Sequence, residues 1–70
     1  MNSLIQTTLL FEYAVIDSLG RNKGWHMGSP LKTLDELPDR IAQLQIQHPK
    51  KSIKTKVYEY SLAFGSRQIA

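Results

Sequence analysis

The chain has 70 residues, no cysteine and a formal net charge of +3 at pH 7. This length predicts a single domain over residues 1–70 with a thin core, because such a chain buries only about 60% of the surface that its unfolded form exposes. The lack of cysteine excludes disulfides and thiolate-bound metals, and the small positive excess favours an anionic partner while falling short of the charge of most dedicated nucleic-acid binders.

The N-terminal region does not resemble a targeting or membrane segment. The first ten residues contain no basic stretch and no cleavage site. The apolar run over residues 9–16 is interrupted by Glu12 and is too short to span a bilayer. Together with the absence of cysteine, these features predict a cytoplasmic protein with no membrane partner.

Residues 5–17 predict a first strand. The segment is rich in β-branched and aromatic residues, and its odd positions form a nearly continuous apolar face: Ile5, Leu9, Phe11, Tyr13 and Val15. A helix is the alternative, because residues 3–6 match a capping box and Gly20 could close a helix after Leu19. We favour the strand, since helical spacing would collect mixed residues on every face.

Residues 17–24 predict a turn, with two glycines and an asparagine suited to reversing the chain. A short second strand over residues 24–28 would complete a hairpin, and Pro30 would end it. Residues 20–24 have the composition of a phosphate-binding loop, but the lysine precedes the last glycine and no helix follows. We therefore expect a hairpin tip at which Arg21 and Lys23 make accessory contacts with an anion.

Residues 33–36 form a capping box that opens a helix. Apolar residues then recur at helical spacing on one stripe, and polar residues occupy the opposite face: Leu34, Leu37, Ile41 and Leu44 against Asp39, Arg40, Gln43 and Gln47. Pro38 is tolerated there if Asp35 is the true cap. Pro49 ends the helix, because it disfavours helical geometry at His48.

Residues 51–64 predict a long last strand, followed by a turn at residues 65–66 into a tail or a short fourth strand. Its apolar phase switches near Val57 and Tyr58, which indicates either a bulge or a strand covered on different faces at its two ends. The predicted fold is α+β: a small, mostly antiparallel sheet of three to four strands in β-β-α-β order, with one helix packed on one face.

The sequence offers little catalytic chemistry. Its six carboxylates are scattered, and His26 and His48 lie on different predicted elements without metal-ligand spacing. No serine has a nearby histidine pattern of the kind that nucleophilic catalysis uses. We therefore predict no enzymatic activity, no metal and no cofactor.

The most informative pattern is a lysine-tyrosine strand. Alternation places Lys54, Lys56, Tyr58 and Tyr60 on one side, which we name the Lys-Tyr face. Such a face can stack nucleic-acid bases on its rings while lysines contact phosphates. The simpler interpretation is that lysines protect an edge strand and tyrosines cover a small sheet. Trp25, the one tryptophan, is either a cap on the thin core, which we favour, or an interface anchor.

The sequence predicts a small non-catalytic binding protein that occupies a surface of a protein partner as a regulator, adaptor or stoichiometric inhibitor, alone or as a homodimer. The predicted contact residues are the Lys-Tyr face (Lys54, Lys56, Tyr58, Tyr60), Trp25, Arg21 and Lys23. The alternative is a nucleic-acid-binding protein that uses the Lys-Tyr face. We favour the protein partner because the net charge is modest and Glu59 stands between the two tyrosines.

Overall fold

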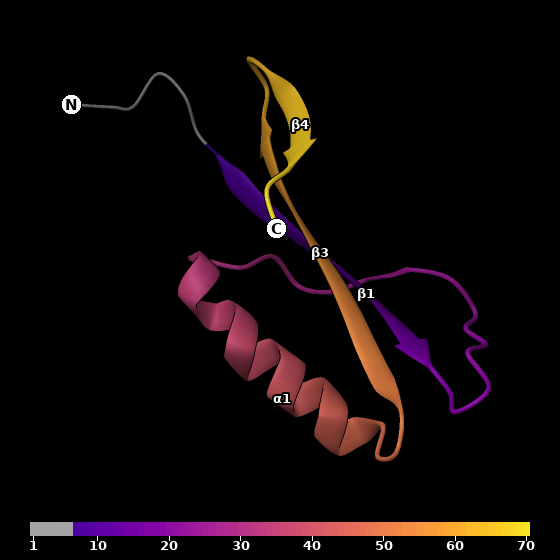
Figure 1. The fold of residues 1–70 in the computed structure, drawn as a ribbon. Coiled ribbons are helices and arrows are strands. Elements are labelled where there is room, and N and C mark those ends of the chain that lie inside the picture. Colours follow the sequence, from indigo (N-terminus) through magenta and orange to yellow (C-terminus); the bar gives the residue numbers. More distant parts are fainter. Residues whose placement is uncertain (1–6) are drawn as a thin grey trace.

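The computed structural model describes residues 7–70, which form a four-stranded antiparallel sheet with one helix against it (Figure 1). The elements in chain order are β1 (Thr8–Ile16), β2 (His26–Met27), the 3-10 turn η1 (Leu34–Glu36), α1 (Leu37–Gln47), β3 (Ser52–Ser61) and β4 (Gly65–Gln68). In the sheet the strands lie in the order β2-β1-β3-β4, and every neighbouring pair is antiparallel.

The α+β class with one helix and a small antiparallel sheet is therefore confirmed. The predicted β-β-α-β order is not the one found. The chain runs β-β-α-β-β, because the segment Gly65–Gln68 turns back at residues 62–64 and pairs with β3 as a complete fourth strand.

The centre of the sheet is the long pairing between β1 and β3. Their register is continuous from Thr8 opposite Tyr60 to Ile16 opposite Ser52, so β3 contains no bulge at the point where its apolar phase switches. The other explanation is wrong as well: Ile53, Val57 and Ser61 are the more buried positions from one end of β3 to the other, so the same face is covered throughout. β1 confirms the predicted strand over Thr8–Ile16, whereas the predicted start at residue 5 and the rival capping box at residues 3–6 lie outside the described residues.

The edge next to β1 is formed by a short strand and a run of loop. Beyond β2, the Gly28 N–H donates to the Phe11 carbonyl at 2.8 Å and the Leu31 N–H to the Leu9 carbonyl at 2.9 Å. A Cβ added to Gly28 would lie 2.6 Å from Phe11 Cδ2, so only glycine fits against this ring. The segment therefore follows β1 closely, although β2 itself is shorter than the predicted strand over residues 24–28.

The hydrophobic core lies between α1 and the face of the sheet that α1 covers. Its buried members are Phe11, Leu31, Leu44 and Val57, and partly buried residues pack around them: Leu9, Tyr13, Leu37, Ile53 and Ile69. Phe11 and Val57 are direct partners across β1 and β3 and have the largest fully buried side chains. This cluster comes from both central strands, the helix and the C-terminal segment, so it joins all the main elements.

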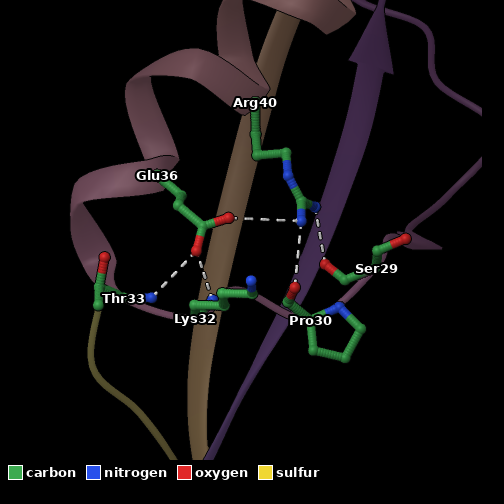
Figure 2. A network of polar contacts seen from close by, with 6 residues as sticks. All are labelled: Ser29, Pro30, Lys32, Thr33, Glu36 and Arg40. Atoms are coloured by element: carbon green, nitrogen blue, oxygen red, sulfur yellow. Dashed lines mark hydrogen bonds and ion pairs between the residues drawn. The ribbon is translucent and has the colours of Figure 1, made fainter.

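The start of the helix follows the predicted capping box with one change. The Glu36 carboxylate accepts the Lys32 N–H at 2.6 Å and the Thr33 N–H at 3.2 Å (Figure 2). The 3-10 turn comes first, so the residue that caps α1 is Glu36 and not Asp35, and Pro38 falls at the start of α1, where its missing N–H is not needed. α1 has 11 residues, and no helix within residues 7–70 is long and apolar enough to cross a membrane.

Arg40 ties the helix to the loop that precedes it. Its guanidinium donates to the Ser29 carbonyl at 2.7 Å and to the Pro30 carbonyl at 3.1 Å, and it lies 3.8 Å from the Glu36 carboxylate (Figure 2). The same group lies 5.9 Å from the centre of the Phe11 ring, within cation–π range. Arg40 therefore does not belong to the solvated polar face on which helical spacing places it.

Candidate partner-binding face

The Lys-Tyr face is a real face of the sheet, and it is the one that α1 leaves open. Val57 points into the core beneath the helix, so alternation along the unbroken β3 sends Lys54, Lys56, Tyr58 and Tyr60 to the opposite side. The cross-strand partners there are Ala14, Glu12, Leu10 and Thr8 in β1. The structure thus brings these four predicted residues together; their role in binding stays a prediction.

Trp25 joins the same face through a contact with Lys56. The Lys56 ammonium lies 4.1 Å from the centre of the Trp25 ring, a close cation–π geometry. Trp25 lies outside the core cluster and is 41% exposed, so the interpretation of this residue as a cap on the core is wrong. The tryptophan instead extends the open face across β1 toward the β2 edge.

The remainder of the open face mixes apolar and charged groups. Met27 lies opposite Glu12 and is 65% exposed, Leu10 lies opposite the half-buried Tyr58, and Tyr60 is 37% exposed. Exposed Met, Trp and Tyr side chains are the types that protein interfaces favour.

Glu59 does not dilute the charge of the Lys-Tyr face. It points to the helix side of β3, where Arg67 of β4 binds its carboxylate at 3.2 Å. The carboxylate that shares the open face with the lysines is Glu12, directly across from Lys56. The net charge of this face is therefore still modest, but the carboxylate that lowers it is Glu12 and not Glu59.

Arg21 and Lys23 are the two predicted contact residues that the structure places elsewhere. They line a pocket of about 580 Å³ at the end of the sheet where β1 meets the loop over residues 17–25. The other lining residues are Val15, Asp17, Asn22, His26, His48 and Lys51. Val15 shares the helix side of β1 with Phe11, so this pocket does not open onto the Lys-Tyr face.

Asp17 organises the loop beside this pocket. Its Oδ1 accepts the backbone N–H groups of Leu19 and Arg21, both at 2.9 Å, and its Oδ2 pairs with Arg21 Nε at 2.9 Å. These contacts hold the pKa of Asp17 below its usual value of 3.8: the Arg21 N–H is the largest cause, and the Leu19 N–H, the guanidinium and the Lys51 charge add to it against a smaller effect of burial. The carboxylate stays ionised and fixes the turn.

The sequence missed that His26 and His48 line the same pocket. His48 caps the end of α1, its N–H donating to the Leu44 carbonyl at 2.9 Å, while the His26 ring lies 5.3 Å from the Tyr13 ring. Because Ile16 pairs with Ser52, the loop that follows α1 lies next to the loop that follows β1. This register cannot be read from the sequence, so the proximity of the two histidines was not predicted. Within residues 7–70 no group of three or more histidine, cysteine or carboxylate side chains is arranged to hold a metal ion.

The tip of the β3–β4 hairpin exposes two large apolar side chains. Leu62 is 92% exposed and Phe64 is 78% exposed, in a turn held by the Phe64 N–H donating to Ser61 Oγ at 3.1 Å. The sequence assigned both residues to a strand face. The hairpin tip follows directly after Tyr60, so it offers an apolar extension at that end of β3.

Comparison with known proteins adds no family to this description. No protein-family model matches the chain, and no match was found among curated proteins or among solved structures. The functional argument therefore depends on the geometry and chemistry of the two surfaces described above.

Proposed function

We propose that this protein is a small, non-catalytic binding protein that docks a protein partner on the open face of its sheet. The observation that supports the proposal is the exposure of large apolar side chains: Trp25, Met27 and Tyr60 are partly exposed on a face that no helix covers. An aromatic and methionine-bearing surface of this kind is typical of the centre of a protein interface.

The chemistry of the face indicates what the partner presents. Lys54 and Lys56 flank the apolar part on β3, so a complementary surface is apolar with carboxylates beside it. The tyrosine hydroxyls add donors and acceptors that stay usable when the rings are covered. We expect an acidic-rimmed apolar patch on the partner.

The size of the face limits the strength of the complex. The ten-residue β3 extends over roughly 33 Å, and four strands span roughly 15 Å, which is less area than the roughly 800 Å² per partner of a standard interface. Binding through this face alone suits a reversible regulator or adaptor. A stoichiometric inhibitor of high affinity would also need the apolar hairpin tip at Leu62 and Phe64.

A nucleic-acid-binding protein is the second candidate, and the specific observation in its favour is that Tyr58 and Tyr60 continue the line of Lys54 and Lys56 on one uncovered face. Two observations weigh against it. Lys56 already occupies one side of the Trp25 ring, and Glu12 lies across from the same lysine. These contacts leave few free cations for a phosphate backbone.

Site-specific photocrosslinking tests the proposed function. A benzophenone amino acid replaces Met27 or Tyr60 in turn, and Gln43 on the exposed side of α1 serves as the matched control. In an extract of the cells that encode the protein, we expect one discrete crosslinked protein from the two sheet positions and none from Gln43. The double variant Lys54→Glu/Lys56→Glu should abolish the crosslink while far-UV circular dichroism stays unchanged.

Two outcomes would overturn this proposal. Equal crosslinking from Gln43 and from the sheet positions would show that the open face is not selective, and a product of twice the monomer mass alone would replace the foreign partner with a second copy. A labelled single-stranded oligonucleotide titrated at about 50 and about 200 mM salt separates the alternative, since phosphate contacts weaken steeply with salt. Tight binding that collapses at the higher salt would favour the nucleic acid.

A further inference from the structure

We infer that the pocket lined by Arg21, Lys23, His26, His48 and Lys51 binds a small molecule that carries a phosphate group. This site lies on the helix side of the sheet, away from the Lys-Tyr face, so the inference does not depend on the proposed function. The pocket joins two segments that are distant in sequence, the loop over residues 17–25 and the chain that leaves α1 over residues 48–51.

The charges around the pocket are strongly unbalanced. Three permanent cations line it, Arg21, Lys23 and Lys51, against the single carboxylate of Asp17. The end of α1 adds a partial negative charge of about one half, which still leaves about +1.5 from these groups. Attraction to the negative end of α1 can explain Lys51, which follows the helix. It does not explain Arg21 and Lys23, which come from a loop before the helix.

Asp17 does not compete with an incoming anion for these cations as a free carboxylate would. Both of its oxygens are already engaged by two backbone N–H groups and by Arg21 Nε at 2.9 Å. Lys51 lines the pocket together with this carboxylate. Asp17 therefore acts as the anchor that holds Arg21 at the site.

The two walls are held by local hydrogen bonds before any ligand binds. The Asn22 side-chain oxygen accepts the Gly24 N–H at 2.9 Å, and the Gly20 N–H donates to the Asp17 carbonyl at 3.0 Å. On the other wall, Gln45 Nε2 donates to the Lys51 carbonyl at 2.9 Å and ties this segment to the helix. A site ordered in advance loses less conformational entropy on binding.

The dimensions of the pocket indicate a phosphate ester more than free phosphate. The pocket has a volume of about 580 Å³ and is half open to solvent, so it has room for a group attached to a tetrahedral anion. Val15 contributes an apolar wall, and the Asn22 amide offers a donor for a hydroxyl group. A sugar phosphate or a similar polar monoester fits this combination of charge, apolar surface and amide.

The first experiment is an NMR titration of ¹⁵N-labelled full-length protein with inorganic phosphate and with ribose 5-phosphate, sodium chloride keeping the ionic strength constant. We expect saturable shifts confined to residues 17–26 and 48–51, with tighter binding of the ester. Lys23→Gln and Lys51→Gln should each weaken binding about three- to tenfold. Lys54→Gln, which removes the same charge from the opposite face, should leave the affinity for both phosphate compounds unchanged.

A second experiment uses sulfate to test the histidines. Sulfate has the tetrahedral shape of phosphate, so its affinity for the wild type and for the double variant His26→Gln/His48→Gln at one pH compares the pocket with and without the imidazoles. The charged residues that line the pocket with them are Asp17, Arg21, Lys23 and Lys51, and the Tyr13 ring lies 5.3 Å from the His26 ring. We expect weaker sulfate binding by the double variant, because an imidazole N–H can donate to the anion, and equal affinity would exclude the histidines from the site.

Three results would overturn the inference. Shifts spread over all lysines, equal weakening by Lys54→Gln and Lys51→Gln, or shifts that grow linearly without saturation would each show general attraction of anions to a basic protein. The oligonucleotide and crosslinking experiments probe the open face, whereas the anion titrations probe the pocket. A negative result for one proposal therefore does not affect the test of the other. Circular dichroism of each variant distinguishes loss of the site from loss of the fold.

Discussion

The two faces of the sheet are built by the same strands and have opposite chemistry. Beneath α1, Phe11 and Val57 meet across β1 and β3 in a fully buried pair. The neighbouring pairs on either side, Leu10 with Tyr58 and Glu12 with Lys56, lie on the face with no helix. Alternate side chains of β3 therefore lie in two environments, one in the core beneath α1 and the next on an open face.

This division also explains why the domain can leave a face uncovered. α1 and the C-terminal segment place Leu44 and Ile69 on the same side as Phe11 and Val57, so one cluster gathers the stabilising burial. On the opposite face Ala14 is buried, and Lys56 and Trp25 contact each other.

The largest expected loss of stability comes from a substitution in the core beneath α1. Phe11→Ala should destabilise the protein by about 3 to 5 kcal/mol, because it removes a fully buried ring and leaves a cavity against Val57. Leu10→Ala, at the neighbouring position on the open face, should cost less than half as much. Urea denaturation followed by Trp25 fluorescence measures both, and equal losses would mean that the two faces are equally buried in solution.

A second prediction tests how closely Gly28 packs against the Phe11 ring. Gly28→Ala should cost about 1 to 3 kcal/mol, since the new methyl group would meet the Phe11 ring at 2.6 Å. Gly28 is the one glycine of the four without a positive φ, so a loss at this position reports the contact with the ring and not backbone strain. Adding Phe11→Leu to Gly28→Ala should recover part of the loss, whereas simple additivity would contradict the contact.

The third prediction concerns the residue that joins the helix to the loop over the covered face. Arg40→Ala should cost about 1 to 2 kcal/mol, because the Ser29 and Pro30 carbonyls lose charge-assisted donors. Arg40→Lys should restore little of this, since one ammonium cannot match the two-pronged geometry. Gln43→Ala on the exposed side of α1 is the control, and a similar loss there would mean that the Arg40 contacts add nothing.

Much of this fold follows from the sequence, because local signals and tertiary packing agree. The alternating pattern of β1, the stop at Pro49 and the apolar stripe through Leu37 and Leu44 all correspond to observed elements. The end of β3 does not, since apolar residues 62–64 continue the strand pattern but form a turn. The turn is made possible by Gly65, with a φ of 75°, and by the hydrogen bond from the Phe64 N–H to Ser61 Oγ. A prediction based on the apolar pattern gives neither feature enough weight to end the strand.

The candidate site was predictable only where one strand defines it. Alternation alone gathers the Lys-Tyr face, and the structure confirms that those four side chains share a side. The approach of Lys56 to Trp25 and the meeting of His26 with His48 depend on the register of β1 against β2 and β3, which no local pattern contains. Arg40 was misplaced for a related reason, because a long side chain can reach carbonyls eleven residues earlier in the chain.

A fourth prediction tests how much the open face contributes to stability. Lys56→Met keeps most of the aliphatic stem but removes the charge above the Trp25 ring, and it should cost about 0.5 kcal/mol at this partly exposed position. Trp25 emission should change with it. Lys54→Met, opposite Ala14 on the same face, should alter neither quantity, and matching changes in both variants would attribute the effect to general charge and not to the contact.

The smallest expected effect lies at the rim between the two faces, where Asp17 fixes the loop. Because its pKa is lowered in the folded protein, Asp17 stabilises the fold above the unfolded value of about 3.9, and this contribution disappears as the pH falls through the lower folded pKa. Asp17→Asn should therefore lower the urea midpoint at about pH 6, and the gap to the wild type should be narrower at about pH 2.5. Asp39→Asn, an exposed carboxylate in the first turn of α1, is the control. An unchanged gap between Asp17→Asn and the wild type at both pH values would show that its hydrogen bonds, and not its charge, hold the loop.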